Sequence, residues 1–335
     1  ILSVSLLVEV LCCGTISYVM GGWFAPWGIE YRVDYLSALM LLLITGVASA
    51  IMPFTYHSVT KEVPQEKHCL FYTTYLLTFT GLLGMVATGD AFNAFVFMEI
   101  ASLSAYVLIS LGQDRRALYA SFQYLILGTI GATFFVIGVG LLYMLTGTLN
   151  MVDLSQRLSG QYDNRVLLAA FSFLIVGLSL KLALFPLHLW LPNSYAYAPT
   201  AVAALLAATG TKVSIYLLLR FSFTVLQVDQ HLELLPVMDV LFPLAVIAML
   251  AGSIVAVYQT NLKRLLAYSS VAQIGYILLG IALASEHGLV GAIVHVFNHG
   301  VMKAALFVII GAVALHSGGG SVQDLAGLGK RMPLT

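Results

Sequence analysis

Apolar residues run along this chain in windows of about twenty, the length at which a helix crosses the hydrocarbon core of a bilayer. Short polar stretches separate the windows. No linker or shift in composition divides them, so we expect one membrane domain, residues 1–335, folded as an all-α polytopic transmembrane helical bundle. The pattern predicts roughly ten spans, at residues 1–20, 33–56, 69–88, 92–111, 117–145, a broken one that includes 178–192, 200–221, 235–258, 262–284 and 288–316.

The sixth window contains two features that lipid penalises, a charge and a helix break. Lys181 lies in the apolar run LSLKLALFPLHLWLP, and Pro186 follows five residues later. Proline has no backbone N–H to donate, so we expect the helix to break there. A buried charge and irregular backbone occur at membrane depth where they are enclosed by protein or line a water-filled cavity. With His188 on roughly the same face as Lys181, this stretch predicts part of a proton route.

The overall composition agrees with the spans and excludes several classes of function. Hydrophobic residues make up 60% of the chain and charged residues 9%, as is typical of helical membrane proteins. The net charge is zero, so no basic surface attracts nucleic acid. The cysteines, Cys12, Cys13 and Cys69, are too few for an iron–sulfur cluster and poorly spaced for zinc. We therefore expect no nucleic-acid partner, no bound metal and no cofactor.

Loop charges predict how the bundle is oriented. The richer side, which should face the cytoplasm, is expected to carry Lys61, Lys67, Arg115, Arg116, Lys263, Arg264, Lys330 and Arg331, and the poorer side Arg32, Arg157, Arg165 and Arg220. The chain begins at Ile1 inside an apolar run and ends in SVQDLAGLGKRMPLT, which resembles a loop between helices. We therefore expect a piece of a longer protein. The polar stretch 146–164 includes NMVDLSQRL, which predicts a short amphipathic helix at the membrane surface.

Ionisable residues inside the spans are the candidates for function, because such residues are rare in lipid. Glu99 has Ser102 and Tyr106 on its own helical face. A carboxylate near Lys181 would favour the ammonium form, whereas burial and a second lysine, Lys212 on the following span, would favour the neutral form. Moving the carboxylate could thus switch Lys181 between holding and releasing a proton. A static structural ion pair is the alternative. The role of Glu9 is open, and pairing with an adjacent subunit is one interpretation.

A second group lies in the run VHVFNHGVMKAALF of the last span. His295, His299 and Lys303 recur every four residues and therefore share one face of the helix. A metal or haem site is the alternative, but neither a carboxylate nor a cysteine stands beside the histidines, and axial haem ligands usually come from different helices. We favour a relay of protons through histidine, water and lysine. The preceding span adds a polar stripe of Ser269, Gln273 and Tyr276.

Five runs of sequence carry a resemblance to a known family. They resemble the proton-translocating antiporter-like membrane subunits of complex I, of Mrp-type cation/proton antiporters and of membrane-bound hydrogenases, in the family's order and over nearly the whole chain. GDAFNAFVFMEI and GTLNMVDLSQRL are most similar to the D-type subunit of Mrp antiporters. The runs are GDAFNAFVFMEIASLSAYVLI, LKLALFPLHLWLPNSYAYAPTAVAALLAATGTKVSIYLL, NLKRLLAYSSVAQIGY, HVFNHGVMKAALF and DLAGLGKRMP.

The resemblance implies roles for individual residues and a repeat architecture. Glu99 matches the family's acidic partner and Lys181 its central lysine on a broken helix. Lys212 matches the next lysine, and His295, His299 and Lys303 match the later helix of histidines and lysine. The family fold contains two inverted five-helix repeats. Here the first would cover residues 69–221 and the second would begin within 235–335, with its own broken helix and the exit path beyond Thr335.

The function implied is proton translocation by one subunit of a multi-subunit membrane complex. The chain would perform no catalytic chemistry itself, and redox chemistry or cation exchange in other membrane subunits would be coupled to it. The first alternative is a subunit of an Mrp-type antiporter, in which Na⁺ is exchanged for protons. The second is a passive membrane anchor of a redox complex. In each case we expect an integral protein of a bacterial or archaeal cytoplasmic membrane.

Overall fold

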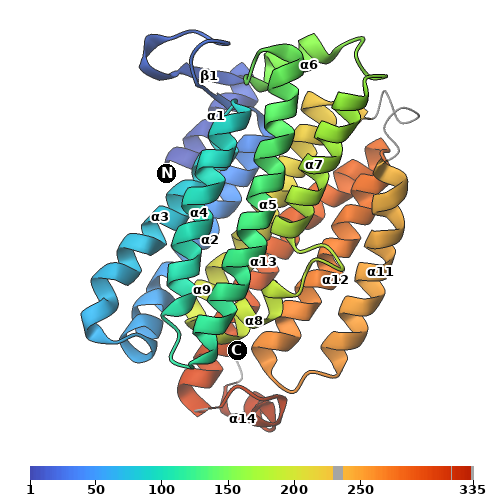
Figure 1. Cartoon of the computed structure of the whole chain (residues 1–335). Helices are drawn as coiled ribbons and strands as arrows, with labels where there is room; N and C mark the ends of the chain where they lie inside the picture. The colour runs from blue at the N-terminus through green and yellow to red at the C-terminus, as the bar shows by residue number, and fades with distance from the viewer. Residues whose placement is uncertain (229–236, 318, 333–335) are drawn as a thin grey trace.

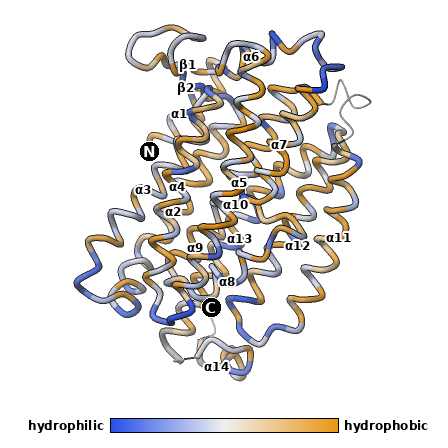
Figure 2. The backbone as a smooth tube through the Cα atoms, viewed as in Figure 1, coloured by the Kyte–Doolittle hydropathy of each residue, from blue (hydrophilic) through white to orange (hydrophobic). Residues whose placement is uncertain are grey.

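The chain folds as a bundle of long helices whose axes are roughly aligned with one another (Figure 1). The computed structural model describes residues 1–228, 237–317 and 319–332. Within these ranges, nine helices are long and apolar enough to cross a membrane. Hydrophobic residues fill the middle of the bundle and hydrophilic residues gather mainly at its two ends (Figure 2). The chain is therefore an integral membrane protein, as predicted.

The elements follow one another in a simple order. A hairpin of β1 (Ile16–Val19) and β2 (Glu30–Val33) separates the first two helices. Short helical turns are η1 (Met20–Gly22), η2 (Gln65–Lys67) and η6 (Val322–Leu325), and η3 (Leu206–Gly210) and η4 (Arg220–Val225) are π-helical. The α-helices are α1 (Leu2–Cys13), α2 (Tyr35–Glu62), α3 (His68–Ala87), α4 (Ala91–Ser110), α5 (Arg116–Thr146), α6 (Met151–Leu158), α7 (Arg165–Leu182), α8 (Trp190–Tyr197), α9 (Thr200–Leu205), α10 (Thr211–Leu219), α11 (Val237–Val257), α12 (Leu262–Ala282), α13 (Glu286–Ser317) and α14 (Leu328–Arg331).

The beginning of the chain differs from the prediction. The expected first span, residues 1–20, is wrong in extent, because α1 ends at Cys13 and Gly14 adopts a φ of 84° that a glycine accepts without strain. The following residues include valine, isoleucine and tyrosine, which favour strands, and β1 pairs antiparallel with β2. The all-α prediction therefore holds for the helical bundle and misses this hairpin at one end of it (Figure 1).

The other spans agree with the hydrophobic pattern to within a few residues. The predicted surface helix is α6, whose first turn is capped by the side chain of Asn150. The predicted seventh span is one continuous path, Thr200–Val225, made of α9, η3, α10 and η4. The expected start of the eighth span, residue 235, lies outside the described residues. The repeat boundaries 69–221 and 235–335 stay predictions.

The predicted break at Pro186 is confirmed. Helix α7 ends at Leu182, and Ala183 takes a left-handed conformation with a φ of 61°. No helix forms between Ala183 and Leu189, and α8 begins at Trp190. Proline cannot donate the backbone hydrogen bond that a continuing helix needs, and its ring restricts the residue before it. The break leaves Lys181 in the last turn of α7.

The turns predicted to face the cytoplasm share one end of the bundle. The α2–α3, α4–α5 and α11–α12 turns lie at the end that also carries α14, opposite the β1–β2 hairpin and α6 (Figure 1). These turns and the helix ends beside them include the basic residues Lys61, Lys67, Arg115 and Lys263. The common location supports the orientation predicted from the loop charges.

Helices α5 and α7 approach each other closely because glycines face one another. A Cβ atom added at Gly177 would lie 2.6 Å from the backbone oxygen of Gly131 and 2.7 Å from the backbone nitrogen of Phe135. Membrane helices commonly associate through such small residues. Since Lys181 follows Gly177 by one turn on α7, this contact holds the lysine close to α5.

Gly177→Ala should therefore destabilise the protein, by about 1–3 kcal/mol as for other overpacked helix contacts. The matched control is Gly140→Ala, because a Cβ atom there would meet nothing within 4 Å. We expect the control to be as stable as the original chain or slightly more stable, since alanine favours a helix. Thermal unfolding in detergent checks both variants. Equal stability of the two would contradict the packing argument.

Candidate functional site

Lys181 lies in the interior of the bundle with its ammonium group held by two side chains of α4. Its Nζ atom is 3.6 Å from Oε1 of Glu99 and donates a hydrogen bond of 2.7 Å to Oγ of Ser102. The Lys181 side chain is 3% exposed, and that of Glu99 is 23% exposed. The structure thus brings together the acidic residue and the lysine that the sequence suggested as partners.

A small cavity adjoins this ion pair. Its volume is about 30 Å³, enough for one or two water molecules. Its lining includes Lys181 and Ser102, Tyr124 of α5, and also Gly210 of η3 and Ser214 of α10. The cavity therefore connects the ammonium of Lys181 with the helix that carries Lys212.

Lys212 is fully buried, and neutral groups hold its ammonium. Nζ donates to the backbone oxygen of Ala207 at 2.6 Å and to Oγ1 of Thr211 at 3.3 Å. Among the described residues, no carboxylate lies within ion-pair distance of this lysine. Ala207 belongs to η3, and π-helical turns frequently mark functional sites because their wider spiral changes the alignment of carbonyl groups.

The predicted stripes of α12 and α13 face each other. Nζ of Lys303, which is fully buried, donates to the backbone oxygen of Leu266 at 2.8 Å and to Oγ of Ser269 at 3.0 Å. Nε2 of His295 lies 2.7 Å from Oε1 of Gln273. The polar residues that periodicity placed on these two spans are therefore in direct contact.

His299 lies between His295 and Lys303 on α13 and is completely buried. Its ring stacks on that of His295, with centroids 6.1 Å apart and planes at 10°. Neither of its ring nitrogens has a hydrogen-bond partner in the described part of the chain. An imidazole has two nitrogens that can accept or donate a proton, so His299 has both available for exchange.

Segment η3 joins the two groups of residues. Gly300 of α13 packs against it so closely that an added Cβ atom would lie 3.1 Å from the backbone oxygen of Ala208. His299 immediately precedes Gly300, and Lys303 follows one turn later, so both lie on the helix that packs against η3. The candidate residues thus form one cluster around Lys181 and another around His299, with η3 and Lys212 between them.

His188 lies apart from these contacts. It is 8% exposed, its ring stacks on Phe185 at 5.3 Å, and it meets Tyr268 of α12 edge-on at 6.2 Å. The helix break lies between Lys181 and His188 and so ends the common helical face that periodicity predicted. His188 is directed toward α12.

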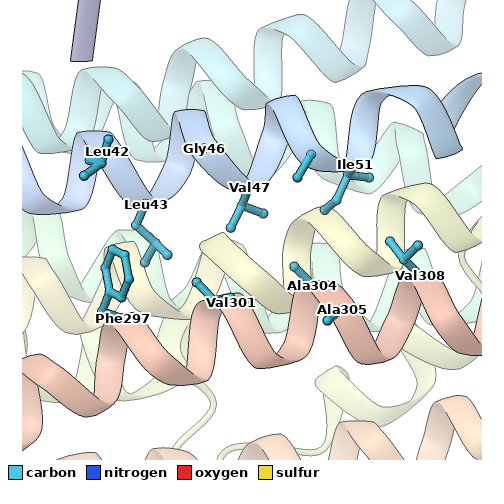
Figure 3. A pocket seen from close by; sticks show the side chains of 11 residues that line it. Leu42, Leu43, Gly46, Val47, Ile51, Phe297, Val301, Ala304, Ala305 and Val308 are labelled. Carbon is cyan, nitrogen blue, oxygen red and sulfur yellow. The ribbon is translucent and has the colours of Figure 1, made fainter. Parts of the chain in front are cut away.

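An apolar groove between α2 and α13 contrasts with these polar clusters. Its volume is about 390 Å³, and Figure 3 shows the side chains that line it. Every lining residue is apolar, so the groove offers no group that could hold or move a proton. The residues are Leu42, Leu43, Gly46, Val47, Ala50, Ile51, Phe297, Val301, Ala304, Ala305 and Val308.

The chain has clear relatives among known proteins. Residues 88–335 match the model of the family described as "NADH:quinone oxidoreductase/Mrp antiporter, TM". The chain belongs to this family. The predicted resemblance is therefore confirmed.

Two curated relatives and two solved structures illustrate the range of the family. The N-type subunit of NADH-quinone oxidoreductase from Desulforudis audaxviator is 44% identical over 95% of this chain and 63% of the relative. The D-type subunit of the Na⁺/H⁺ antiporter from Alkalihalophilus pseudofirmus is 33% identical over 99% of this chain and 66% of the relative. The chain thus spans just under two thirds of the length of these two relatives.

The structural neighbours agree with these relatives. A chain of the archaeal membrane-bound sulfane sulfur reductase, a respiratory membrane complex, superimposes with a TM-score of 0.87 and 34% identity over 99% of this chain and 67% of its own. A chain of the Mrp complex from Dietzia sp. gives a TM-score of 0.84 and 28% identity over 94% of this chain and 57% of its own. The helical membrane fold of the antiporter family is thereby confirmed.

The sequence interpretation missed a buried cation in this family member. Arg220 was expected in an outer loop, but it lies in η4 and is 9% exposed. Its guanidinium pairs with Asp34 and donates to Oγ of Ser37 at 2.8 Å and to the hydroxyl of Tyr216 at 2.8 Å. Arg220 follows Lys212 and Tyr216 at four-residue spacing, a signal that would have placed it on their helical face.

Asp34 connects this pair to the start of α2. Its carboxylate accepts a hydrogen bond of 3.0 Å from the backbone nitrogen of Ser37 and so caps the helix. Burial raises the pKa of Asp34, but the hydrogen bond and positive charge of Arg220, together with Ser37, outweigh burial and hold the pKa below its usual value. The ionised form is therefore favoured in the folded protein. The Asp34–Arg220 pair fastens α2 to η4.

Asp34→Asn should lower the stability at neutral pH by at least about 1 kcal/mol, because it leaves a largely buried guanidinium without its counter-charge. Asparagine caps helices as well as aspartate, so the loss reports the ion pair. A lowered pKa stabilises the fold above the ordinary pKa of aspartate and ceases to do so as the pH falls through the lowered value. The variant and the original chain should thus converge in strongly acidic solution.

The control for this prediction is Asp153→Asn, which removes an i,i+4 pair with the half-exposed Arg157. Such surface pairs contribute about 0.3–0.5 kcal/mol. Thermal unfolding as a function of pH measures both variants. A loss in Asp34→Asn no larger than in Asp153→Asn would show that the buried pair does not stabilise the fold.

Proposed function

We propose that the chain translocates protons across the membrane as an antiporter-like subunit of a multi-subunit complex. The single observation that carries this proposal is the buried ammonium of Lys181, 3.6 Å from Glu99 and next to a cavity with room for water. A charged side chain at membrane depth costs about 2.5–3.5 kcal/mol even on insertion scales, and such residues usually lie on ion pathways. The family to which the chain belongs supports the same conclusion.

The first step of the mechanism is a switch at Lys181. While Glu99 is close, its negative charge favours the ammonium form, and Ser102 accepts one of the ammonium hydrogens. When the carboxylate moves away, burial favours the neutral amine, and Lys181 releases its proton to water in the adjoining cavity. The side chain of Glu99 is partly exposed, whereas that of Lys181 is almost fully buried, so we propose that Glu99 is the mobile partner.

The second step carries the proton beyond the cavity. Ser214 and Gly210 also line the cavity, and Lys212 between them in the sequence is held by neutral groups that bind an amine as well as an ammonium. From Lys212 the route continues past His299 to Lys303 and His295. Because Lys212, His299 and Lys303 are all fully buried, a positive charge on one of them disfavours protonation of its neighbours, which pushes the proton onward.

His188 belongs to the same route at the level of the broken helix. We propose that it exchanges protons with the α12 side, where Tyr268 contacts its ring, and not directly with Lys181. An imidazole can take up and release a proton near neutral pH, as this exchange requires.

The driving force would come from partner subunits. One relative is named as a subunit of NADH-quinone oxidoreductase and another as a subunit of a Na⁺/H⁺ antiporter, so the coupled process is redox chemistry or exchange for Na⁺. We place the chain in the cytoplasmic membrane of a bacterium or archaeon, with the basic turns beside α14 facing the cytoplasm. A passive anchor is the remaining alternative, and it would have no need for a titratable lysine beside a cavity with room for water.

Glu99→Gln tests the proposal, because it keeps the size of the side chain and removes the charge that switches Lys181. We expect the complex to assemble and its proton transport to fall at least about tenfold, the factor that corresponds to an interaction of about 1.4 kcal/mol. Proton uptake into vesicles, divided by the amount of assembled complex, is the measurement. The control is Glu66→Gln in η2, an exposed carboxylate, which should transport normally.

The same vesicles distinguish the alternatives. Transport that depends on an electron donor indicates redox coupling, and transport that depends on a Na⁺ gradient indicates exchange. Normal proton transport in Glu99→Gln would rule out the switch. Absence of proton transport from the unmodified complex under every condition would favour the passive anchor.

A further inference from the structure

A stack of three aromatic rings stands beside Lys181, and the mechanism above does not use it. The rings of Trp190, the first residue of α8, and Tyr124 of α5 are parallel, with centroids 4.0 Å apart and planes at 4°. Tyr106 of α4 meets Tyr124 edge-on, with centroids 4.7 Å apart and planes at 82°. The stack therefore joins α4, α5 and α8 across the site.

Trp190 also forms a hydrogen bond that the helix break makes necessary. Its Nε1 atom donates to the backbone oxygen of Leu180 at 2.9 Å. The last carbonyl groups of a helix lack the donors that a further turn would supply. In a continuing helix the backbone nitrogen of Leu184 would donate to Leu180, but here it donates to the backbone oxygen of Ser179 at 3.0 Å. Within the described chain, the other donor to Leu180 is the backbone nitrogen of Ala183, at the longer distance of 3.3 Å. The buried indole thus provides the shorter of the two bonds.

The bond acts on the residue next to the lysine. Leu180 immediately precedes Lys181 in the last turn of α7, so fixing its carbonyl fixes the rotation of that turn and the direction of the lysine side chain. An unrestrained helix end frays, because its last residues lack a full set of backbone hydrogen bonds. The indole of Trp190, which is 2% exposed, is held rigidly by its stacking on Tyr124.

The stack also reaches the groups that Lys181 binds. Tyr124 lines the same cavity as Lys181 and Ser102. Tyr106 lies one turn after Ser102 on α4, and its hydroxyl occupies the space that a side chain at Gly128 of α5 would need. One set of rings therefore holds the helix of the lysine, the helix of its acceptor and the wall of the cavity in a fixed relation.

We propose that Trp190 is a positioning residue that directs the ammonium of Lys181 toward Glu99 and Ser102 by holding the carbonyl of Leu180, and that Tyr124 and Tyr106 support it. This inference rests on the proposed function, since it adds a residue to the switch at Lys181. A fixed carbonyl at Leu180 explains why α7 keeps a defined end next to Lys181, the residue proposed to carry the proton.

Trp190→Phe is the first test, in the full chain and in the complex to which that chain belongs. Phenylalanine keeps an aromatic ring against Tyr124 and removes the N–H donor. We expect transport per assembled complex to fall about fivefold, the change that loss of one neutral hydrogen bond corresponds to. The matched control is Trp27→Phe, the same chemical change at a side chain that is 88% exposed, and it should transport normally.

The second test keeps a tryptophan at position 190 and uses fluorine NMR to detect changes in its environment. A fluorotryptophan is incorporated site-specifically at position 190, and its fluorine resonance is compared between the original complex and Glu99→Gln. Coupling between two sites is reciprocal, so a residue that positions Lys181 should itself sense the loss of the Lys181 counter-ion. We expect a shifted or broadened resonance in Glu99→Gln and an unchanged one in Glu66→Gln, since Glu66 is exposed and lies outside the site.

The outcomes separate this inference from the proposed function. If Trp190→Phe assembles and transports as fast as the original complex while Glu99→Gln does not, the positioning role is wrong and the switch stands. If Glu99→Gln transports normally, the switch is wrong. Should Trp190→Phe fail to assemble, the resonance decides, because an unchanged signal in Glu99→Gln would overturn the coupling between Trp190 and Lys181.

Discussion

The burial of one ammonium ion, that of Lys181, is the constraint to which the surrounding structure responds. Removing such an ion from water costs several kcal/mol unless a counter-charge and hydrogen bonds compensate. Here Glu99 supplies the charge, Ser102 supplies an acceptor, and the adjoining cavity has room for water. The helix break after Leu182 leaves the lysine at a helix end, and the close α5–α7 contact at Gly177 keeps that end against the neighbouring helix.

Besides Lys181, the buried cations among the described residues are held in two different ways. Lys212 and Lys303 contact backbone oxygens and hydroxyl groups, which tolerate a neutral amine, whereas Arg220 pairs with the carboxylate of Asp34. An arginine does not lose its proton in proteins, but a buried lysine can. The lysines are therefore suited to exchange protons, and the arginine is suited to fasten α2 to η4. Residue type and partner agree in each case.

Local patterns in the sequence predicted the structural features that are determined by residues close together in the chain. Hydrophobic windows located the spans, Pro186 located the break, and four-residue spacing placed His295, His299 and Lys303 on one face of α13. The early end of α1 at Gly14 was missed because the apolar run continues past it. The π-helical turns η3 and η4 were missed because they keep the composition of an α-helix and differ in the spacing of their hydrogen bonds.

Contacts between distant segments were harder to predict. The hydroxyl oxygens of Ser37 and Tyr216 lie 3.0 Å apart, although the two residues are 179 positions apart in the sequence and no periodicity relates them. The site of Arg220 could have been predicted in part, since it continues the face of Lys212, but its partner Asp34 could not. The pairing of Glu99 with Lys181 was predicted because both are rare ions in apolar spans, each of which needs a partner in lipid. The direction of the His188 side chain was not predicted, because the helix break after Leu182 ends the helical face that Lys181 and His188 were expected to share.

The most direct test of the central claim, that Lys181 holds and releases a proton, is proton uptake by vesicles that contain equal amounts of assembled complex with Lys181 or with Lys181→Arg. Arginine keeps the positive charge and pairs well with a carboxylate, so it can replace a lysine that merely anchors Glu99. It does not deprotonate, so it cannot replace a proton carrier. The account predicts that the arginine variant assembles and conducts poorly. Full proton uptake by that variant would contradict it.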